Sequence, residues 1–356
     1  MNVQHRMKMG LTAGLLAAVT LAGCASGSSS DTKAGAVAKP AEKVTLRLGY
    51  LANITHAPAL VGLQKGIFAD KLGPDVTLVP SVFNAGPAET EALFSGAIDA
   101  TYIGPNPAIN AYAKSNGQAV RIISGATSGG AFLVVNPSIN SAADLKGKKV
   151  ASPQLGNTQD VALRSWLKSQ GLKTDTQGGG DVSIVPQDNA TALTAFESGA
   201  IAGAWEPEPW ASRMVQEGKG KVLVDERSLW PAGQFVTTEL MVRTAFLNEH
   251  PDVVQRLLEA QVSATDFINA NPAEAKALAN QGLQQATGKA LSTSVLDAAW
   301  PHMTFTDDPL ASSLRTGAAN AKAVGLLDPN TKLDGLFDLT LLNKVLKADG
   351  KPEVHS

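Results

Sequence analysis

Short segments with the pattern of β-strands alternate with longer segments of helical pattern from residue 44 onward. Residues 44–50 place Val44, Leu46, Leu48 and Tyr50 on one face of a strand. Strands are also predicted at residues 76–79, 101–103, 120–124, 132–135, 149–151, 182–185 and 235–242, and helices at residues 56–66, 88–95, 107–115 and 158–170. This alternation predicts an α/β fold with two mostly parallel sheets flanked by helices.

The chain turns helical after Thr244. Asn248 is predicted to be a helix N-cap, with Pro251 in the first turn. An apolar stripe follows at residues 253, 254, 257, 258 and 262, and these positions share one face of a helix.

The globular part contains an internal repeat with a period of about 105 residues, far too long for a solenoid. Three elements recur in the same order: residues 75–80 as 181–186, residues 91–98 as 194–201, and residues 104–107 as 206–209. The repeat predicts two copies of one α/β unit. The alternative is a chance resemblance between common strand–turn–helix segments.

Two copies of one unit imply two lobes. We expect the chain to leave lobe 1 near Asn136 and Pro137 and to return near Phe235, so that lobe 1 comprises residues 44–135 and 237–356 and lobe 2 residues 136–236. Ligands of open α/β sheets bind at the carboxyl ends of strands. Two such sheets facing each other, joined by a hinge of two crossings, form a cleft that closes on a small solute.

The N-terminal segment has the features of a lipoprotein signal peptide. Arg6 and Lys8 precede an apolar stretch at residues 11–22, which is shorter than the about 20 residues that span a bilayer. The run Leu-Ala-Gly-Cys that ends at Cys24 matches the bacterial lipobox. We expect cleavage after residue 23, acylation of Cys24 and a flexible tether over residues 24–43. The alternative is an unlipidated secreted protein.

Charge and cysteine content exclude several classes of function. The formal net charge is −2, and loss of Arg6 and Lys8 makes it −4, so no nucleic-acid partner is expected. Cys24 is the only cysteine, and its acylation leaves no thiol for a disulfide, a thiolate metal site or nucleophilic catalysis.

Several motifs at the predicted cleft resemble those of the substrate-binding proteins of ABC importers. They are residues 46–50, 53–57, 95–99, 104–107 and 156–158. The branch that is most similar binds nitrate, sulfonates or taurine and includes relatives for bicarbonate and thiamine precursors. The resemblance spans about residues 44–345 and implies a periplasmic-binding-protein-like fold of type II. It also implies a monomeric receptor that delivers its ligand to a membrane permease with its ATPase.

Polar residues at predicted helix starts are the candidate ligand contacts. Asn53, Thr55 and His56 precede the first helix of lobe 1, and Asn157 and Thr158 occupy the equivalent place in lobe 2. Free N–H groups and the positive end of the helix dipole favour an anion there. The same residues also suit simple helix capping.

Other candidates follow neighbouring strands. Gly104 and Asn106 begin a further helix, and glycine allows the backbone to approach a solute closely. Ser128 and Gly129 follow a strand in a similar way, unless they form only a flexible turn.

Three charged or titratable residues leave alternatives open. His56 could contact a ligand, cap its helix or bind a metal, although no short His/Asp/Glu cluster accompanies it. Glu206 and Glu208 lie in a Pro-rich run between two tryptophans, and we expect one of them to face the cleft. A buried carboxylate there needs a cationic ligand group or His56, whereas the alternative is a solvated turn.

The favoured hypothesis is an importer receptor for a small organic anion, either an aliphatic sulfonate or a taurine-like zwitterion. Nitrate, bicarbonate or a thiamine pyrimidine is the alternative ligand. An enzyme that builds the thiamine pyrimidine is a different class, but its cysteine-rich iron motif and other common catalytic motifs are missing from the sequence. A sensor lipoprotein without a permease is a third class. No cofactor or metal is expected, and the predicted location is the extracytoplasmic face of the cell membrane, or the periplasm.

Overall fold

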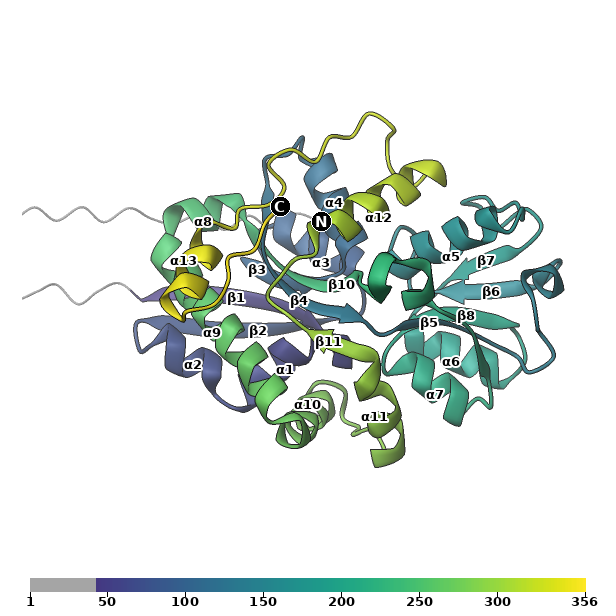
Figure 1. Cartoon of the computed structure of the whole chain (residues 1–356), viewed down its shortest axis with the longest axis horizontal. Helices are drawn as coiled ribbons and strands as arrows, with labels where there is room; N and C mark the ends of the chain where they lie inside the picture. Colours follow the sequence, from purple (N-terminus) through teal and green to yellow (C-terminus); the bar gives the residue numbers. More distant parts are fainter. Residues whose placement is uncertain (1–42) are drawn as a thin grey trace, which may run out of the picture. The chain divides into compact units, whose positions relative to one another are not determined.

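The protein is described here by a computed structural model, which covers residues 43–356. The predicted signal peptide, Cys24 and the tether up to residue 42 lie outside the described residues. Within residues 43–356, two sheets each carry helices on both faces (Figure 1). None of the helices in this part of the chain is long and apolar enough to cross a membrane.

The first sheet is the framework of lobe 1. It has six strands in the order β2-β1-β3-β10-β4-β11. Their bounds are β1 Val44–Leu51, β2 Val76–Phe83, β3 Ala100–Ile103, β4 Val120–Gly129, β10 Val236–Arg243 and β11 Met303–Phe305. The helices of this lobe are α1 Ala57–Gln64, α2 Ile67–Leu72, α3 Gly86–Phe94, α4 Pro105–Lys114, α8 Thr244–Glu249, α9 Pro251–Ala270, α10 Pro272–Thr287, α11 Thr293–Ala299, α12 Ala311–Ala323 and α13 Thr340–Ala348.

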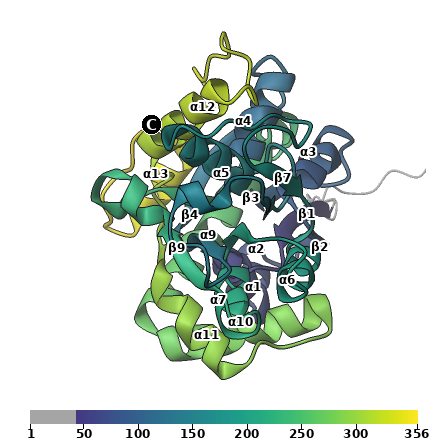
Figure 2. The same cartoon turned by 90° about the vertical axis from the view of Figure 1, so that its right-hand side faces the viewer.

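The second sheet is the framework of lobe 2. Its five strands follow the order β7-β6-β8-β5-β9. Their bounds are β5 Ala131–Val135, β6 Lys149–Ser152, β7 Ser183–Pro186, β8 Gly203–Pro207 and β9 Lys221–Asp225. Figure 2 shows this lobe end-on, with α5 (Thr158–Ser169) over one face and α6 (Asn189–Glu197) and α7 (Trp210–Gln216) over the other.

The strand order of the two sheets reproduces the internal repeat of the sequence. Strands β2, β1 and β3 of the first sheet correspond to β7, β6 and β8 of the second, and β10 and β4 correspond to β5 and β9. The repeated segments 75–80 and 181–186 form β2 and β7, which are both edge strands. Two copies of one α/β unit therefore face each other.

The sheets are mixed rather than mostly parallel, which corrects the sequence-based expectation. In the first sheet β1 pairs in parallel with β2 and β3, but β10 and β4 run antiparallel to their neighbours. In the second sheet β6 pairs in parallel with β7 and β8, whereas β5 is antiparallel to β8 and β9. Strands β5 and β10, which enter each sheet from the opposite lobe, are antiparallel to both of their neighbours, and the edge strand β11 is antiparallel to β4.

The first crossing comes earlier than the expected exit at Asn136 and Pro137. Strand β5 pairs with β8 and β9, so residues 131–135 belong to lobe 2. The chain changes sheets at Gly129 and Gly130, whose φ angles of 82° and 74° lie in the left-handed region that glycine adopts without strain. The apolar residues 131–135 have the same strand pattern whichever sheet they join, so the sequence could not show where the chain passes from the first sheet to the second.

The predicted N-cap at Asn248 is wrong. Asn248 lies inside α8, and α9 begins at Pro251 with His250 as its N-cap. Proline has no N–H and disfavours helical geometry in the residue before it, so the break falls directly in front of Pro251. The predicted stripe from Val253 to Val262 is buried, as expected.

Candidate functional site

A small polar cavity lies between the two lobes, at the edge where their parallel strands end. Its volume is about 20 Å³, room for one or two water-sized groups. It is lined by Leu51, Asn53, Thr55, His56, Asn84, Gly104, Pro153, Asn157, Thr158, Gln159, Asn189, Pro207 and Thr237. None of these described lining residues is Asp, Glu, Lys or Arg, so neutral hydrogen-bonding groups dominate the surface.

Both copies of the repeat contribute to this cavity in the same way. In lobe 1, Asn53, Asn84 and Gly104 follow the carboxyl ends of β1, β2 and β3. In lobe 2, Asn157 and Asn189 follow β6 and β7, while Pro207 ends β8. The six parallel strands therefore point their carboxyl ends at one place, which is where open α/β sheets bind ligands.

Helix N-termini converge on the cavity for the same reason. Gly104 is the N-cap of α4, Asn157 is the N-cap of α5, and Asn189 is the first residue of α6. The segment Ile54–His56 leads directly into α1. Helix N-termini carry unsatisfied N–H groups and a partial positive charge, so this convergence favours an anion without any basic side chain.

A buried ion pair holds the α5 end of the cavity in shape. The carboxylate of Asp160 accepts hydrogen bonds from the Gly156 N–H at 2.9 Å, the Ser152 hydroxyl at 2.9 Å and Nε of Arg164 at 3.0 Å. Both charged side chains are almost completely buried. Because Asn157 follows Gly156 directly, this network fixes the loop that presents Asn157 and Thr158.

His56 is placed to donate one hydrogen bond into the cavity. Its Nδ1 accepts from the Leu51 N–H at 3.3 Å, so the ring proton of the neutral form sits on Nε2. No described residue accepts a hydrogen bond from Nε2. Burial lowers the pKa of His56 from 6.5 to about 3, and the ring is therefore a neutral donor at physiological pH.

Thr158 and Gly104 meet across the cavity from opposite lobes. A Cβ atom at Gly104 would lie 2.6 Å from Oγ1 of Thr158, so only glycine allows this approach. Oγ1 of Thr158 is buried and finds no hydrogen-bond partner among the described residues. An unpaired buried hydroxyl is costly, and at a ligand cavity it is an available donor or acceptor.

The comparisons with known proteins agree with this architecture. The model of the NMT1-like family matches residues 39–282. The chain belongs to the NMT1-like family. Within it, the protein is a substrate-binding protein of the ABC-importer type, related to binding proteins for taurine, sulfonates and nitrate.

Two curated relatives of this NMT1-like protein are 27% and 28% identical to it. A Brucella abortus protein, named as a binding protein without a ligand, is 27% identical over 292 residues, which are 81% of this chain and 85% of the relative. The taurine-binding periplasmic protein of Escherichia coli is 28% identical over 236 residues, 66% of this chain and 70% of that protein. These relatives are binding proteins rather than enzymes, as the sequence predicted.

Solved structures share the fold of the NMT1-like protein. The periplasmic nitrate-binding protein NrtA from Synechocystis superposes with a TM-score of 0.73 at 20% identity, over 86% of this chain and 89% of that one. The alkanesulfonate-binding protein SsuA from Xanthomonas axonopodis gives a TM-score of 0.66 at 20% identity, over 86% and 98%. The predicted periplasmic-binding-protein-like fold is confirmed.

Six of the sequence-predicted site residues line the cavity, and five do not. Asn53, Thr55, His56, Gly104, Asn157 and Thr158 are brought together. Asn106 lies in an adjoining cavity, where its side-chain amide donates to the Gly317 carbonyl at 3.4 Å. Ser128 pairs with β10 and β11, and the carbonyl of Gly129 accepts from the hydroxyl of Thr237. Gly129 is therefore connected with the cavity through Thr237, whereas Ser128 is paired within the sheet.

Glu206 and Glu208 lie outside the lining of the cavity. Glu206 is fully buried behind Asn189, whose amide nitrogen donates to it at 3.0 Å. Burial raises the pKa of Glu206 well above 4.5, which favours the protonated form. Glu208 accepts from the backbone and hydroxyl of Ser212 at the start of α7, and it contacts Nδ1 of His302 in lobe 1 at 2.8 Å.

Asn84, Asn189, Gln159 and Thr237 are cavity residues that sequence reasoning missed. The repeat contained a signal for two of them, because Asn84 and Asn189 each follow the repeated edge strand by a few residues. Gln159 comes directly after Thr158. Thr237 carried no local signal, since it lies on β10, which returns from lobe 2.

A metal site for His56 finds no support. Across residues 43–356, no group of three or more His, Cys, Asp or Glu side chains could hold a metal ion. The residues that line the cavity together with His56 include amides and hydroxyls but no carboxylate.

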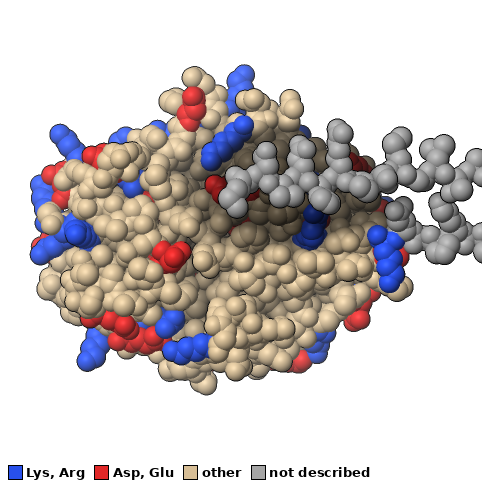
Figure 3. All heavy atoms as spheres, turned by 180° about the vertical axis from the view of Figure 1, so that it is seen from behind, with Lys and Arg blue, Asp and Glu red and all other residues tan. Residues whose placement is uncertain are grey.

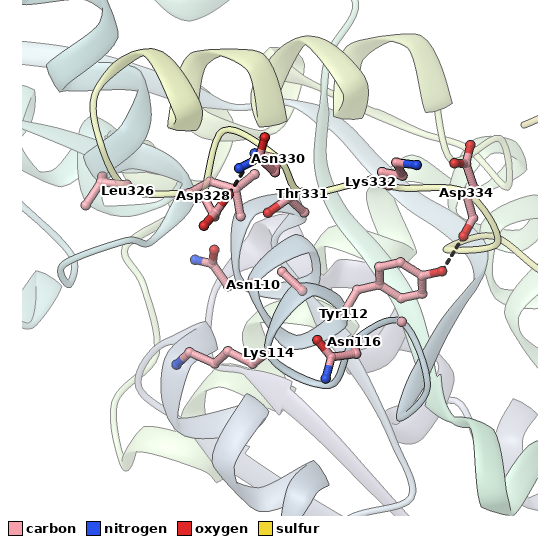
Figure 4. Close-up of a pocket in the computed structure, with 13 residues that line it drawn as sticks. Asn110, Tyr112, Lys114, Asn116, Leu326, Asp328, Asn330, Thr331, Lys332 and Asp334 are labelled. Atoms are coloured by element: carbon pink, nitrogen blue, oxygen red, sulfur yellow. Dashed lines mark hydrogen bonds between the residues drawn. The ribbon is translucent and has the colours of Figure 1, made fainter.

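A large groove of the protein lies outside the cleft. Figure 4 shows this hollow of about 750 Å³ between the end of α4 and residues 326–334, where the Tyr112 hydroxyl donates to the Asp334 carbonyl. It is open and belongs to lobe 1 alone, so closure of the lobes cannot bury a solute there. On the face in Figure 3, basic and acidic side chains are interspersed, mostly near the outline of the molecule, without an extended patch of one sign among the described residues in view.

Proposed function

We propose that the protein is the receptor of an ABC importer for a small organic anion with a sulfonate-type head, such as an aliphatic sulfonate or a taurine-like compound. It acts as a monomer, held at the extracytoplasmic face of the membrane by a lipid on Cys24, and delivers the anion to the permease and its ATPase. The anchor and these partners follow from the sequence motifs, and Cys24 lies outside the described residues.

One observation supports an anion as the ligand: helix N-termini and neutral hydrogen-bond donors from both lobes converge on a cavity whose lining contains no Asp, Glu, Lys or Arg. A cation would find no carboxylate in this lining. An anion finds the positive helix ends, Nε2–H of His56 and the amides of Asn53 and Asn157. A ligand at this place bridges the lobes, so binding and closure are coupled.

The ligands named for related proteins narrow the choice. Relatives or proteins of the same fold are named as binding taurine, alkanesulfonates or nitrate, and all three ligands carry a planar or tetrahedral oxyanion. The small volume of the cavity, about 20 Å³, favours nitrate or bicarbonate as the second candidate, because these ions have no further atoms to place.

Calorimetric titration of the mature protein with ethanesulfonate, taurine, nitrate, bicarbonate and a thiamine pyrimidine tests the proposal. Ligand binding also raises the melting temperature by mass action, which gives an independent readout. The proposal expects the sulfonates to bind most tightly. Tighter binding of nitrate or bicarbonate would replace the sulfonate by the second candidate, and binding of the pyrimidine alone would overturn the anion class.

A further inference from the structure

A second, larger groove between the lobes adjoins the polar cavity. Its volume is about 450 Å³, and both lobes contribute to it: α7 from lobe 2, and the end of α10 with the segment that follows it from lobe 1. The lining residues are Ala52, Pro209, Trp210, Arg213, Glu217, Leu283, Thr287, Lys289, Ala290, Leu291 and Ser292. Nothing in the proposed head-group site uses this space.

The side chain of Trp210 separates the groove from the cavity. Its Nε1 points toward the cavity side, where it donates to Oδ1 of Asn53 at 2.8 Å and lies 3.2 Å from the amide oxygen of Asn189. Its ring lines the groove and stacks under the Arg213 guanidinium, 4.7 Å from the ring centroid. The two residues after β1 are divided between the same two spaces, since Ala52 lines the groove and Asn53 lines the cavity. The Trp210 indole therefore contacts residues of the cavity on one side and lines the groove on the other.

We propose that this groove binds the apolar tail of the anion whose head occupies the polar cavity, and that a movement of the Trp210 indole joins the two spaces. The inference rests on the proposed function. The substrate class is then an amphiphilic sulfonate with a linear or aryl tail. The cavity of about 20 Å³ cannot hold such a tail, so a ligand with more than a few atoms must displace one of its walls.

Part of the groove offers an apolar surface to a tail, and Thr287, Lys289 and Ser292 add polar groups to the lining. Leu283, Leu291, Ala290 and Pro209 supply aliphatic surface next to the indole. Arg213 is paired with Glu217 at 2.8 Å, so its charge is largely neutralised. Burial of methylene groups against such a surface stabilises a complex in proportion to the area removed from water.

The opposite side of the cavity is less suited to a tail. Thr158 also lines a second small cavity of about 20 Å³, which contains Asn106 and Glu226. The groove of about 320 Å³ beyond it is smaller than the groove beside Trp210 and includes Leu229. Its polar lining residues are Ser165, Ser169, Glu226, Thr316 and Asn320, and its aromatic ones are Trp166 and Trp230. A tail directed there would have to pass the small cavity that contains Asn106 before it reached this groove.

A series of linear alkanesulfonates tests the tail subsite. We expect the affinity of the mature protein to rise by roughly threefold to fourfold per methylene from methanesulfonate to octanesulfonate, the increment for a buried methylene. Leu291→Gln should flatten this rise and leave methanesulfonate binding intact, because methanesulfonate has no tail. Leu229→Gln, in the opposite groove, is the matched control and should keep the rise. Ala290→Trp, at an exposed position, fills the groove and should weaken octanesulfonate selectively.

Tryptophan fluorescence reports the movement of the indole. Octanesulfonate should change the emission of the wild-type protein more than methanesulfonate does, and the extra change should vanish in Trp210→Phe. The tail subsite is overturned if the affinity of the wild-type protein does not depend on chain length, or if it rises with chain length by the same factor in Leu291→Gln as in the wild type. In either case the proposed head-group site is unaffected. If Leu229→Gln, rather than Leu291→Gln, abolishes the rise in affinity with chain length, the tail lies in the opposite groove, and this result also overturns the proposed subsite. Failure of methanesulfonate and all longer sulfonates to bind refutes the proposed function, and the subsite with it.

Discussion

The indole of Trp210 in lobe 2 donates a hydrogen bond of 2.8 Å to the side-chain oxygen of Asn53 in lobe 1. Asn53 follows β1, and Trp210 follows β8 as the first residue of α7. The bond therefore links the edges of the two sheets at which the parallel strands end. It lies beside the polar cavity and exists only when the lobes are close together. Ligand affinity should therefore depend on it.

Replacement of Trp210 by phenylalanine keeps most of the apolar ring and removes the N–H donor. One neutral hydrogen bond contributes about 0.5–1.5 kcal/mol, so Trp210→Phe should weaken ethanesulfonate binding by roughly twofold to tenfold. Calorimetric titration measures the change. Trp300→Phe, in lobe 1 and packed on Phe305, is the control and should bind as the wild type does. Unchanged affinity in Trp210→Phe would show that the bond does not contribute to closure.

His56 should act as a neutral donor, so binding should not depend on its protonation. Its pKa is lowered to about 3 by burial, and the ring stays neutral as the pH falls through 6.5, the ordinary value. Ethanesulfonate does not titrate in this range, and its affinity should be constant between about pH 5 and pH 8. His56→Ala should weaken binding about tenfold or more, since it removes a donor to a charged group. A steep gain in affinity below pH 6.5 would mean that a protonated imidazole binds the anion.

The repeat made half of the site predictable from the sequence. Asn157 and Thr158 were placed at a helix start, and the equivalent position in lobe 1 pointed to Asn53, Thr55 and His56. The folded protein brings all five to one cavity. The physical reason is that strand ends and helix starts of parallel βα units are fixed by local pattern, while the sheet topology brings them to one edge.

The partners of the buried carboxylates were not predictable. Nothing near Glu208 in the sequence points to His302, which comes from a segment 94 residues later. Glu226 carried no motif, yet its carboxylate accepts from the indole nitrogens of Trp205 at 2.7 Å and Trp230 at 3.3 Å. The contact between Glu208 and His302 depends on how the chain folds back after the second crossing, and no local periodicity in the sequence indicates it.

Glu226 should make stability fall as the pH rises. Burial raises its pKa from 4.5 to about 7, although the two indole donors oppose the shift. The folded protein thus keeps a proton that the unfolded chain loses, and this contribution is full below pH 4.5 and declines as the pH rises through 7. The loss is at most about 3 kcal/mol in the free energy of unfolding.

Glu226→Gln removes this titration. Denaturant unfolding of both proteins across the pH range gives the difference between their free energies of unfolding. The difference should shift in favour of the variant as the pH rises from about 4.5 to about 7, and it should level off above that range. A difference that is constant with pH would show that Glu226 has an ordinary pKa in the folded protein.

Glu208 should hold the lobes rather than select the charge of the ligand. Its carboxylate is occupied by Ser212 and His302 and does not line the cavity. Glu208→Gln should therefore weaken taurine and ethanesulfonate by the same factor, as titration of both ligands can measure. A selective loss of taurine would mean that the carboxylate binds the ligand's ammonium group, as the sequence alone had suggested.

Thr158→Val gives the most direct test of the site, because its hydroxyl is buried at the cavity without a partner among the described residues. Removal of an unpaired hydroxyl should leave the free energy of unfolding equal or higher, whereas loss of a hydrogen bond to an anion costs about 1.5–3 kcal/mol, or roughly tenfold or more in affinity. Ethanesulfonate titration and denaturant unfolding of the same variant measure both quantities. We expect a protein that is at least as stable as the wild type and binds the anion much more weakly. Unchanged affinity in Thr158→Val would contradict the placement of the anion between the two lobes.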